Sequence, residues 1–115
     1  MTQPTPDVTE QDVHRILRRD YAPADHEAIG AAIAALEVRE KWRVVLACLK
    51  NGAGNTAKAL DELGHASGYY RESIGEAEYP LATRKWSRIE SFSDAEREAI
   101  YAKDWKQYQE WLHRS

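Results

Sequence analysis

The sequence predicts an all-α protein, a compact bundle of five or six helices with one long central helix. Apolar side chains recur at steps of three and four residues along most of the chain, and this spacing gathers them on one face of a helix. Residues that favour helix starts and stops, such as Thr9, Ser93 and Gly54, stand between these stretches. No run of alternating β-branched residues competes as a strand.

The length and composition fit a single soluble domain. The 115 residues predict a flexible polar tail at 1–8 and one helical domain at 9–115. A hydrophobic content of 43% is ordinary for a globular protein. The net charge of −3 argues against nucleic acid or an anionic membrane as the partner of the whole molecule. No apolar stretch approaches the roughly 20 residues that a membrane span needs.

The N-terminus and the single cysteine bear on the cellular compartment. Residues 1–7 contain neither a basic start nor an apolar run, so no signal peptide is predicted. Cys48 is the only cysteine, which excludes an intrachain disulfide and a structural zinc site built on cysteines. We therefore expect a cytoplasmic protein. Cys48 lies near the C-terminal end of its predicted helix and beside apolar residues, which predicts a buried, unreactive thiol.

Three helices are predicted before residue 52. The first is capped by Thr9 and ends near Asp20, Ala22-Pro23 starts the second, and the third runs from about residue 39 to 50. Their apolar stripes are Val13, Ile16, Leu17 and Tyr21; Ile29, Ile33 and Leu36; and Trp42, Val45, Leu46 and Leu49. Val44 and Cys48 widen the last stripe, so the third helix is predicted to be the most buried. A glycine of the segment 51–54 is expected to supply its left-handed C-cap.

Residues 55–78 carry the longest apolar seam of the sequence. It consists of Leu60, Leu63, Ser67, Tyr70, Ile74 and Ala77, at alternating steps of three and four residues. Glycines at positions 64, 68 and 75 lie inside this stretch, although glycine is unfavourable within a helix. We favour one long helix, with a bend allowed, in which the glycines let another helix approach closely. The alternative is a break at Gly64 that gives two shorter helices.

The last third of the chain predicts a short helix and a long one. Tyr79-Pro80 ends the preceding helix because the residue before proline avoids the helical region. A short helix is expected from Leu81 to Ile89. Ser93 and Glu96 form a capping-box pattern, and the final helix is expected from Asp94 to about His113. Its predicted apolar face carries Tyr101, Trp105, Tyr108 and Leu112, with Trp111 beside them.

Residues 43–80 combine three short sequences. An apolar-basic helix, Arg43-Val44-Val45-Leu46-Ala47-Cys48-Leu49-Lys50, is followed by a glycine turn and then by a long helix that ends in Ala77-Glu78-Tyr79-Pro80. This arrangement resembles a group of small, uncharacterised helical proteins of bacteria. The resemblance implies an all-helical fold, and it implies no activity, cofactor or site residue. The glycines at positions 64 and 68 depart from the pattern of that group.

Two Glu-x-x-His motifs suggest a carboxylate-bridged metal site. Glu62 and His65 form one motif, and Glu110 and His113 form the other. On helices, two such motifs with a glutamate from each of two further helices can hold two iron ions. Against this, Glu62 and His65 lie beside the apolar seam, and His113 lies where a terminal helix frays. We favour the interpretation as solvated side chains and expect no metal and no cofactor.

A second hypothesis is nucleic-acid binding. Residues 59–67 contain the Leu-Gly step of a helix-turn-helix turn, after which residues 68–74 would form the recognition helix. That helix would present Arg71 as its only basic residue, which is few for base and phosphate contacts. Arg84, Lys85 and Arg88 flank Trp86 in a basic cluster, and His14, Arg15, Arg18 and Arg19 form another. Both clusters are more simply read as solvated helix faces.

The aromatic content points to interfaces. Four Trp and six Tyr are many for a chain of this size, and aromatic side chains are enriched where proteins meet. The candidates for partner contacts are Trp105, Tyr108, Trp111 and Trp86, with a second copy of the chain or another protein as the partner. The sequence thus favours a small non-enzymatic protein-interaction or regulatory module. The alternatives are a helix-turn-helix-like nucleic-acid-binding protein and, third, a carboxylate-bridged metal enzyme.

Overall fold

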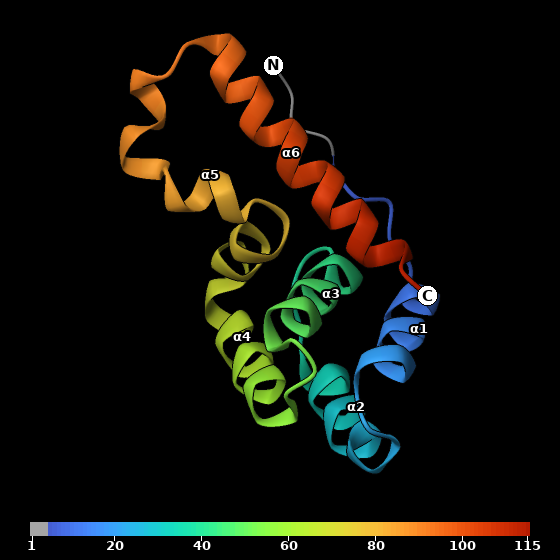
Figure 1. Ribbon diagram of the computed structural model, residues 1–115. Coiled ribbons are helices and arrows are strands. Elements are labelled where there is room, and N and C mark those ends of the chain that lie inside the picture. Colours follow the sequence, from blue (N-terminus) through green and yellow to red (C-terminus); the bar gives the residue numbers. More distant parts are fainter. Residues whose placement is uncertain (1–4) are drawn as a thin grey trace.

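The computed structural model describes residues 5–115, except for the side chains of Trp86 and Ser87, and confirms the all-α prediction. Its helices are α1 (Glu10–Asp20), α2 (His26–Ala35), α3 (Lys41–Gly52), α4 (Thr56–Glu78), α5 (Pro80–Arg84) and α6 (Asp94–His113) (Figure 1). Two short 3-10 segments, η1 (Pro23–Asp25) and η2 (Trp86–Ser91), complete the described structure, which contains no strand. None of these helices has both the length and the apolar character needed to cross a membrane.

The predicted caps of the first and last helices are formed. Thr9 accepts a hydrogen bond from the backbone N–H of Asp12, and the Asp12 side chain accepts one from Thr9 in return. Ser93 and Glu96 make the same reciprocal arrangement at the start of α6. Each box satisfies two backbone donors that a helix N-terminus would otherwise leave free. The short helix predicted from Leu81 to Ile89 is instead divided at Lys85 into α5 and η2.

The centre of the bundle is α3. Its six consecutive residues from Val44 to Leu49 are at most 1% exposed, which confirms the prediction that this helix is the most buried. Its most extensive contact is with α4, and it also packs against α1. The long helix predicted at residues 55–78 is α4, which also packs against α2, α5 and α6. A helix can be apolar on all sides only when neighbouring segments cover it, and α4 covers much of α3.

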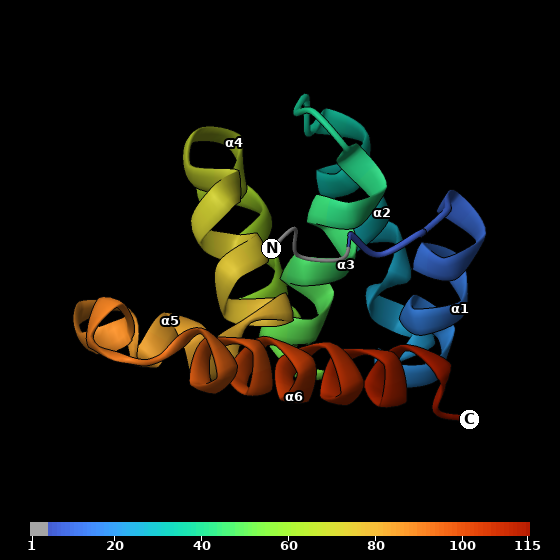
Figure 2. The ribbon, with the colours of Figure 1, turned by 90° about the horizontal axis from the view of Figure 1, so that it is seen from above.

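The helix α4 is bent at Tyr69, where φ −135° and ψ 44° leave the helical region. Figures 1 and 2 show its two arms, residues 56–68 and 70–78, meeting at an angle. Ala59, Leu63 and Ala66 of the first arm are buried, and Ser73 and Ala77 of the second arm are buried as well. The bend allowed by the sequence is thus present, but the chain does not break at Gly64.

Gly64 and Gly68 do not mark the close helix contact that the sequence suggested, whereas a Cβ added at Gly75 would lie 3.3 Å from Thr83 Oγ1 of α5. A methyl group added at Gly64 or at Gly68 would meet no atom of a neighbouring segment within 4 Å. The tight position is Gly52, at the end of α3, where an added Cβ would clash with the Tyr21 hydroxyl and lie 2.9 Å from Ala59 Cβ. The left-handed C-cap of α3 is also not a glycine, because Ala53 adopts it with φ 52°, and Gly54 follows with φ 84°.

The last helix crosses one end of the bundle, past α4, α3 and α1 (Figure 2). Tyr108 and Leu112 join the main core, in which seventeen buried residues of the described chain pack together. A second, smaller cluster consists of Tyr79, Ala82 and Ile89, against which Phe92, Ile100 and Tyr101 pack. The helix α6 therefore connects two apolar clusters of unequal size.

Candidate functional site

The two Glu-x-x-His motifs do not converge. His65 Nε2 lies 2.9 Å from Glu72 Oε2, and its ring stacks on Tyr69 with the centroids 4.9 Å apart. His113 lies at the exposed end of α6, where its Nε2 is 3.2 Å from Gln109 Oε1. Among the described residues, no three His, Cys, Asp or Glu side chains gather as metal ligands would. The arrangement required for a carboxylate-bridged centre is not formed there.

The turn required by the helix-turn-helix hypothesis is also not formed. Residues 63–65, which would have made it, are continuous helix in the first arm of α4. The bend at Tyr69 lies within the segment that would have been the recognition helix. Arg71 is exposed at the start of the second arm, with its guanidinium 5.9 Å from the centre of the Tyr70 ring.

The aromatic partner candidates mainly anchor α6. Tyr108 is 1% exposed, which leaves its ring no surface to offer a partner. Trp111 is half-buried, with Arg19 5.4 Å and Lys50 6.0 Å from its ring centre. Trp105 is half-buried, and the side chain of Trp86 lies outside the described residues. Among the described large hydrophobic side chains, the exposed one is Tyr69, at 61%.

Arg19 departs from the prediction of a solvated basic face on α1. Its side chain is 14% exposed and forms a two-pronged ion pair with Asp20. The Arg19 Nη1 atom also donates to the backbone oxygens of Trp111 and Arg114, each at 2.7 Å. A positive charge on the last carbonyls of a helix is favourable, so Arg19 fixes the C-terminal end of α6 against α1.

The prediction that Cys48 is buried is confirmed. Its side chain is fully buried, and burial, with a further contribution from the charge of Glu62, raises the pKa of the thiol to about 12. A thiol with this pKa holds almost no thiolate at neutral pH, and the thiolate is the reactive form. Cys48 is a core residue without the properties of a nucleophile.

Two buried acidic residues were not predicted from the sequence. Glu78 is 2% exposed and pairs with Arg43, whose Nε and Nη2 donate to its two oxygens at 2.8 Å each. This hydrogen-bonded pair raises the pKa of Arg43 further above its ordinary value. Asp104 is 1% exposed and accepts hydrogen bonds at 3.0 Å from the backbone N–H groups of Leu81 and Ala82 at the start of α5. The one available signal was that Asp104 stands four residues before Tyr108 on the apolar face of α6.

An open groove, which we name the arginine groove, lies beside the Arg43–Glu78 pair. It is lined by Arg39, Glu40, Arg43, Tyr70, Arg71 and Ile74 and encloses about 520 Å³. One wall is the start of α3, where Glu40 adopts a left-handed conformation with φ 50°. The other wall is the beginning of the second arm of α4. Arg39 and Arg71 are exposed, whereas Arg43 is held between Glu78 and Glu40, with Nη1 3.2 Å from Glu40 Oε2.

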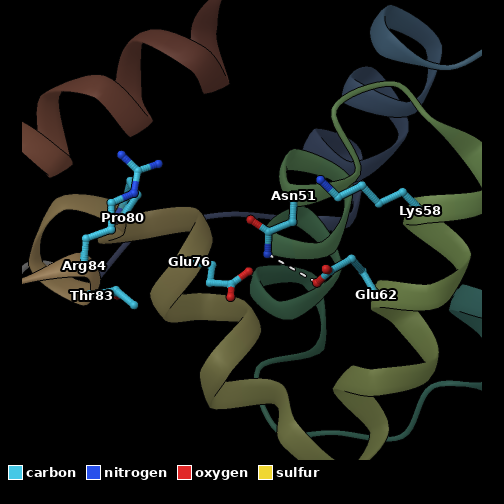
Figure 3. Close-up of a pocket in the computed structure, with 7 residues that line it drawn as sticks. All are labelled: Asn51, Lys58, Glu62, Glu76, Pro80, Thr83 and Arg84. Atoms are coloured by element: carbon cyan, nitrogen blue, oxygen red, sulfur yellow. Dashed lines mark hydrogen bonds between the residues drawn. The ribbon is translucent and has the colours of Figure 1, made fainter. Parts of the chain in front are cut away.

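A second cavity, which we name the polar cleft, opens where α3, both arms of α4 and α5 meet (Figure 3). It encloses about 370 Å³ and is lined by Asn51, Lys58, Glu62, Glu76, Pro80, Thr83 and Arg84. The amide nitrogen of Asn51 donates to the backbone oxygen of Ser73 at 3.0 Å and lies 3.5 Å from Glu62 Oε2. Thus one of the metal candidates, Glu62, lines a cleft of mixed charge.

Comparison of the chain with known protein families, with curated proteins and with solved structures finds no match. The resemblance of residues 43–80 to a bacterial family therefore stays a prediction.

Proposed function

We propose that this protein is a non-enzymatic interaction module that binds an acidic segment of a partner protein in the arginine groove. The observation that carries the proposal is the placement of Arg39, Arg43 and Arg71 around one open groove. Guanidinium groups bind carboxylates through paired hydrogen bonds, which give direction as well as attraction.

The charges around the groove favour an acidic ligand. Arg43 is paired with the carboxylates of Glu40 and of the buried Glu78, whereas Arg39 and Arg71 form no ion pair among the described side chains, which leaves an excess of positive charge at this place. The chain as a whole has a net charge of −3. A local positive region on an acidic protein directs an acidic partner to one place, because the rest of the surface repels it.

The groove also has an apolar component. Tyr70 and Ile74 stand one turn apart on the second arm of α4 and are each partly buried. A ligand that combines carboxylates with apolar side chains would bury area on these two residues while its acids reach the arginines. We therefore expect a segment in which acidic and apolar residues alternate closely.

The surroundings of the groove disfavour nucleic acid. Glu72 follows Arg71 directly on the same arm of α4, and Glu40 lines the groove itself. A duplex carries negative charge along its whole length and needs a broad basic surface. A short acidic segment needs only the groove, so it is the better match to this distribution of charge.

A labelled peptide of alternating glutamate and leucine tests the proposal by fluorescence anisotropy at low salt. The double variant Arg39→Gln/Arg71→Gln should bind it about tenfold more weakly, since two rim charges are lost. Both arginines are exposed, so the fold should be retained. Arg18→Gln, at an exposed arginine of α1, is the matched control and should leave binding unchanged.

Two results would contradict the proposal. One is equal binding of the peptide to the double variant and to the unchanged protein. The other is equal binding of a peptide in which glutamine replaces every glutamate. If duplex DNA bound more tightly than the acidic peptide, and Arg71→Ala abolished that binding, the nucleic-acid alternative would replace this one.

A further inference from the structure

The polar cleft exists because α4 is bent. Glu62 and Glu76 are 14 residues apart in the sequence. In a straight helix they would be separated by about 21 Å, since each residue adds about 1.5 Å. The bend at Tyr69 turns the second arm back, so that both carboxylates line the same cavity of about 370 Å³ (Figure 3). The end of α3 and the helix α5 also line it.

The charged side chains of the cleft are of both signs and are not paired with one another. Lys58 and Arg84 are positive, and Glu62 and Glu76 are negative. Across the part of the chain whose side chains are described, no ion pair joins any two of these four. In the view of Figure 3, both carboxylates lie on one side of the Asn51 amide oxygen, and the ends of Lys58 and Arg84 lie on the other side.

Two further polar groups of the cleft are held in place. Asn51 is half-buried, and its amide nitrogen is engaged by the Ser73 backbone oxygen. Figure 3 shows its Oδ1 atom turned away from Glu62, where it can accept a hydrogen bond. The Thr83 hydroxyl donates to the backbone oxygen of Gly75 at 3.0 Å, which holds α5 against the second arm.

We propose that the polar cleft binds a small zwitterionic molecule of the amino-acid class. Its ammonium group binds Glu62 and Glu76, and its carboxylate binds Lys58 and Arg84. A simple cation would leave Lys58 and Arg84 repelling it, and a simple anion would meet the two glutamates. A dipolar molecule satisfies both pairs at once. The polar cleft and the arginine groove share no lining residue, so this site is independent of the proposed partner-binding function.

The first experiment is a titration of the protein with the common L-amino acids and simple dipeptides, followed through the backbone amide signals in NMR spectra. The cleft is open, so we expect a dissociation constant of roughly 1 mM and titrate to about 10 mM. For the best ligand, the N-acetylated form lacks the ammonium group and the amide form lacks the carboxylate. Each blocked form should bind at least about tenfold more weakly.

Variants of the protein test whether the charged residues of the cleft bind the ligand. Glu76→Gln and Arg84→Gln should each weaken binding of the unblocked ligand about tenfold, and both residues are exposed enough to be replaced without loss of fold. Glu72→Gln lies on the same arm of α4 but outside the cleft, and Arg88→Gln is an exposed arginine outside it. These two controls should bind like the unchanged protein.

The proposal is overturned by any of three results. The first is that no amino acid or dipeptide shifts the signals of the cleft at about 10 mM. The second is that Glu76→Gln and Arg84→Gln bind the ligand as the unchanged protein does. The third is that one blocked form binds as tightly as the parent, which would make the cleft a site for a simple cation or a simple anion.

Discussion

At the scale of single residues, the buried Glu78 is held on both of its carboxylate oxygens. It is 2% exposed, and each of its oxygens accepts a hydrogen bond from Arg43. Removing two charges from water is costly, and only close pairing of the kind observed compensates for it. The pair also joins α3 to the end of α4 and holds Arg43 at the wall of the arginine groove.

Replacing Glu78 by Gln should destabilise the protein by about 3 kcal/mol, because Arg43 would keep its charge without a carboxylate partner. The measurement is the free energy of unfolding in urea. Glu72→Gln breaks the exposed contact with His65, where Glu72 is 67% exposed, and should cost less than about 1 kcal/mol. Similar losses in the two variants would show that the buried pair has no special role.

The sequence could predict which single residues are apolar and buried, and it could not predict the partners of buried acids. Cys48 was correctly placed because its neighbours in the sequence are apolar. Glu78 and Asp104 were missed because their partners are remote, 35 residues away for Arg43 and 23 residues away for Leu81. An acidic residue within a helix is usually solvated, and only the packed fold reveals the exceptions.

At the scale of elements, α4 shows what helical periodicity does and does not fix. Leu63 of the first arm and Ala77 of the second arm are both buried, so the apolar pattern continues across the bend. Ser67, which the pattern placed in the seam, is exposed and donates to the backbone oxygen of Gly64 instead. The apolar seam is therefore interrupted at Ser67, two residues before the bend at Tyr69. The periodicity marks the buried face of each arm, but it does not mark the residue at which the helix bends.

The glycines of the two helices should respond oppositely to alanine. Gly64→Ala should stabilise the protein by about 0.5–1 kcal/mol, because the new methyl group enters open space and alanine favours the helix. Gly52→Ala should destabilise it by about 1–3 kcal/mol, since the methyl group would overlap Tyr21 and Ala59. The thermal unfolding midpoints of the two variants, compared with that of the unchanged protein, measure both effects. Two shifts of the same sign would contradict the described packing.

At the scale of the whole molecule, the fold class followed from sequence, and the arrangement of helices did not. The helix starts, stops and stripes are local features, so five of the six helices were anticipated near their observed bounds. The placement of α6 depends on contacts between distant segments. Arg19 of α1 binds the end of α6, and Asp104 of α6 caps α5. No local sequence pattern predicts such contacts, so the arginine groove and the polar cleft could not be predicted.

Alkaline pH should unfold the protein. Burial raises the pKa of Cys48 from 9.0 to about 12 and that of Tyr21 from 10.0 to about 12, and it raises the pKa values of Tyr79 and Tyr108 as well. These groups keep their protons in the folded state and lose them in the unfolded state, so stability falls as the pH rises from about 9 to 12. Lys50, whose pKa is lowered by burial, acts in the opposite direction.

The measurement is the urea midpoint at neutral pH and at about pH 11, together with the ultraviolet absorbance of tyrosinate. Tyr108→Phe is an informative variant because the Tyr108 hydroxyl is buried without a hydrogen-bond partner among the described residues. It should match the unchanged protein at neutral pH and be more stable at alkaline pH. If the urea midpoint of the unchanged protein were the same at neutral pH and at about pH 11, the predicted loss of stability would be contradicted.

The contact between α3 and α4 has a kinetic consequence. It is the most extensive contact of the fold, and only residues 53–55 separate the two helices. Contacts between neighbours in the sequence form quickly because little loop entropy is lost. We therefore expect the α3–α4 hairpin to assemble first and α6 to dock last. In stopped-flow refolding of a Trp42→Phe/Trp86→Phe variant, whose remaining tryptophans are Trp105 and Trp111 of α6, helical circular dichroism should recover ahead of the fluorescence. Simultaneous recovery would argue for assembly in one step.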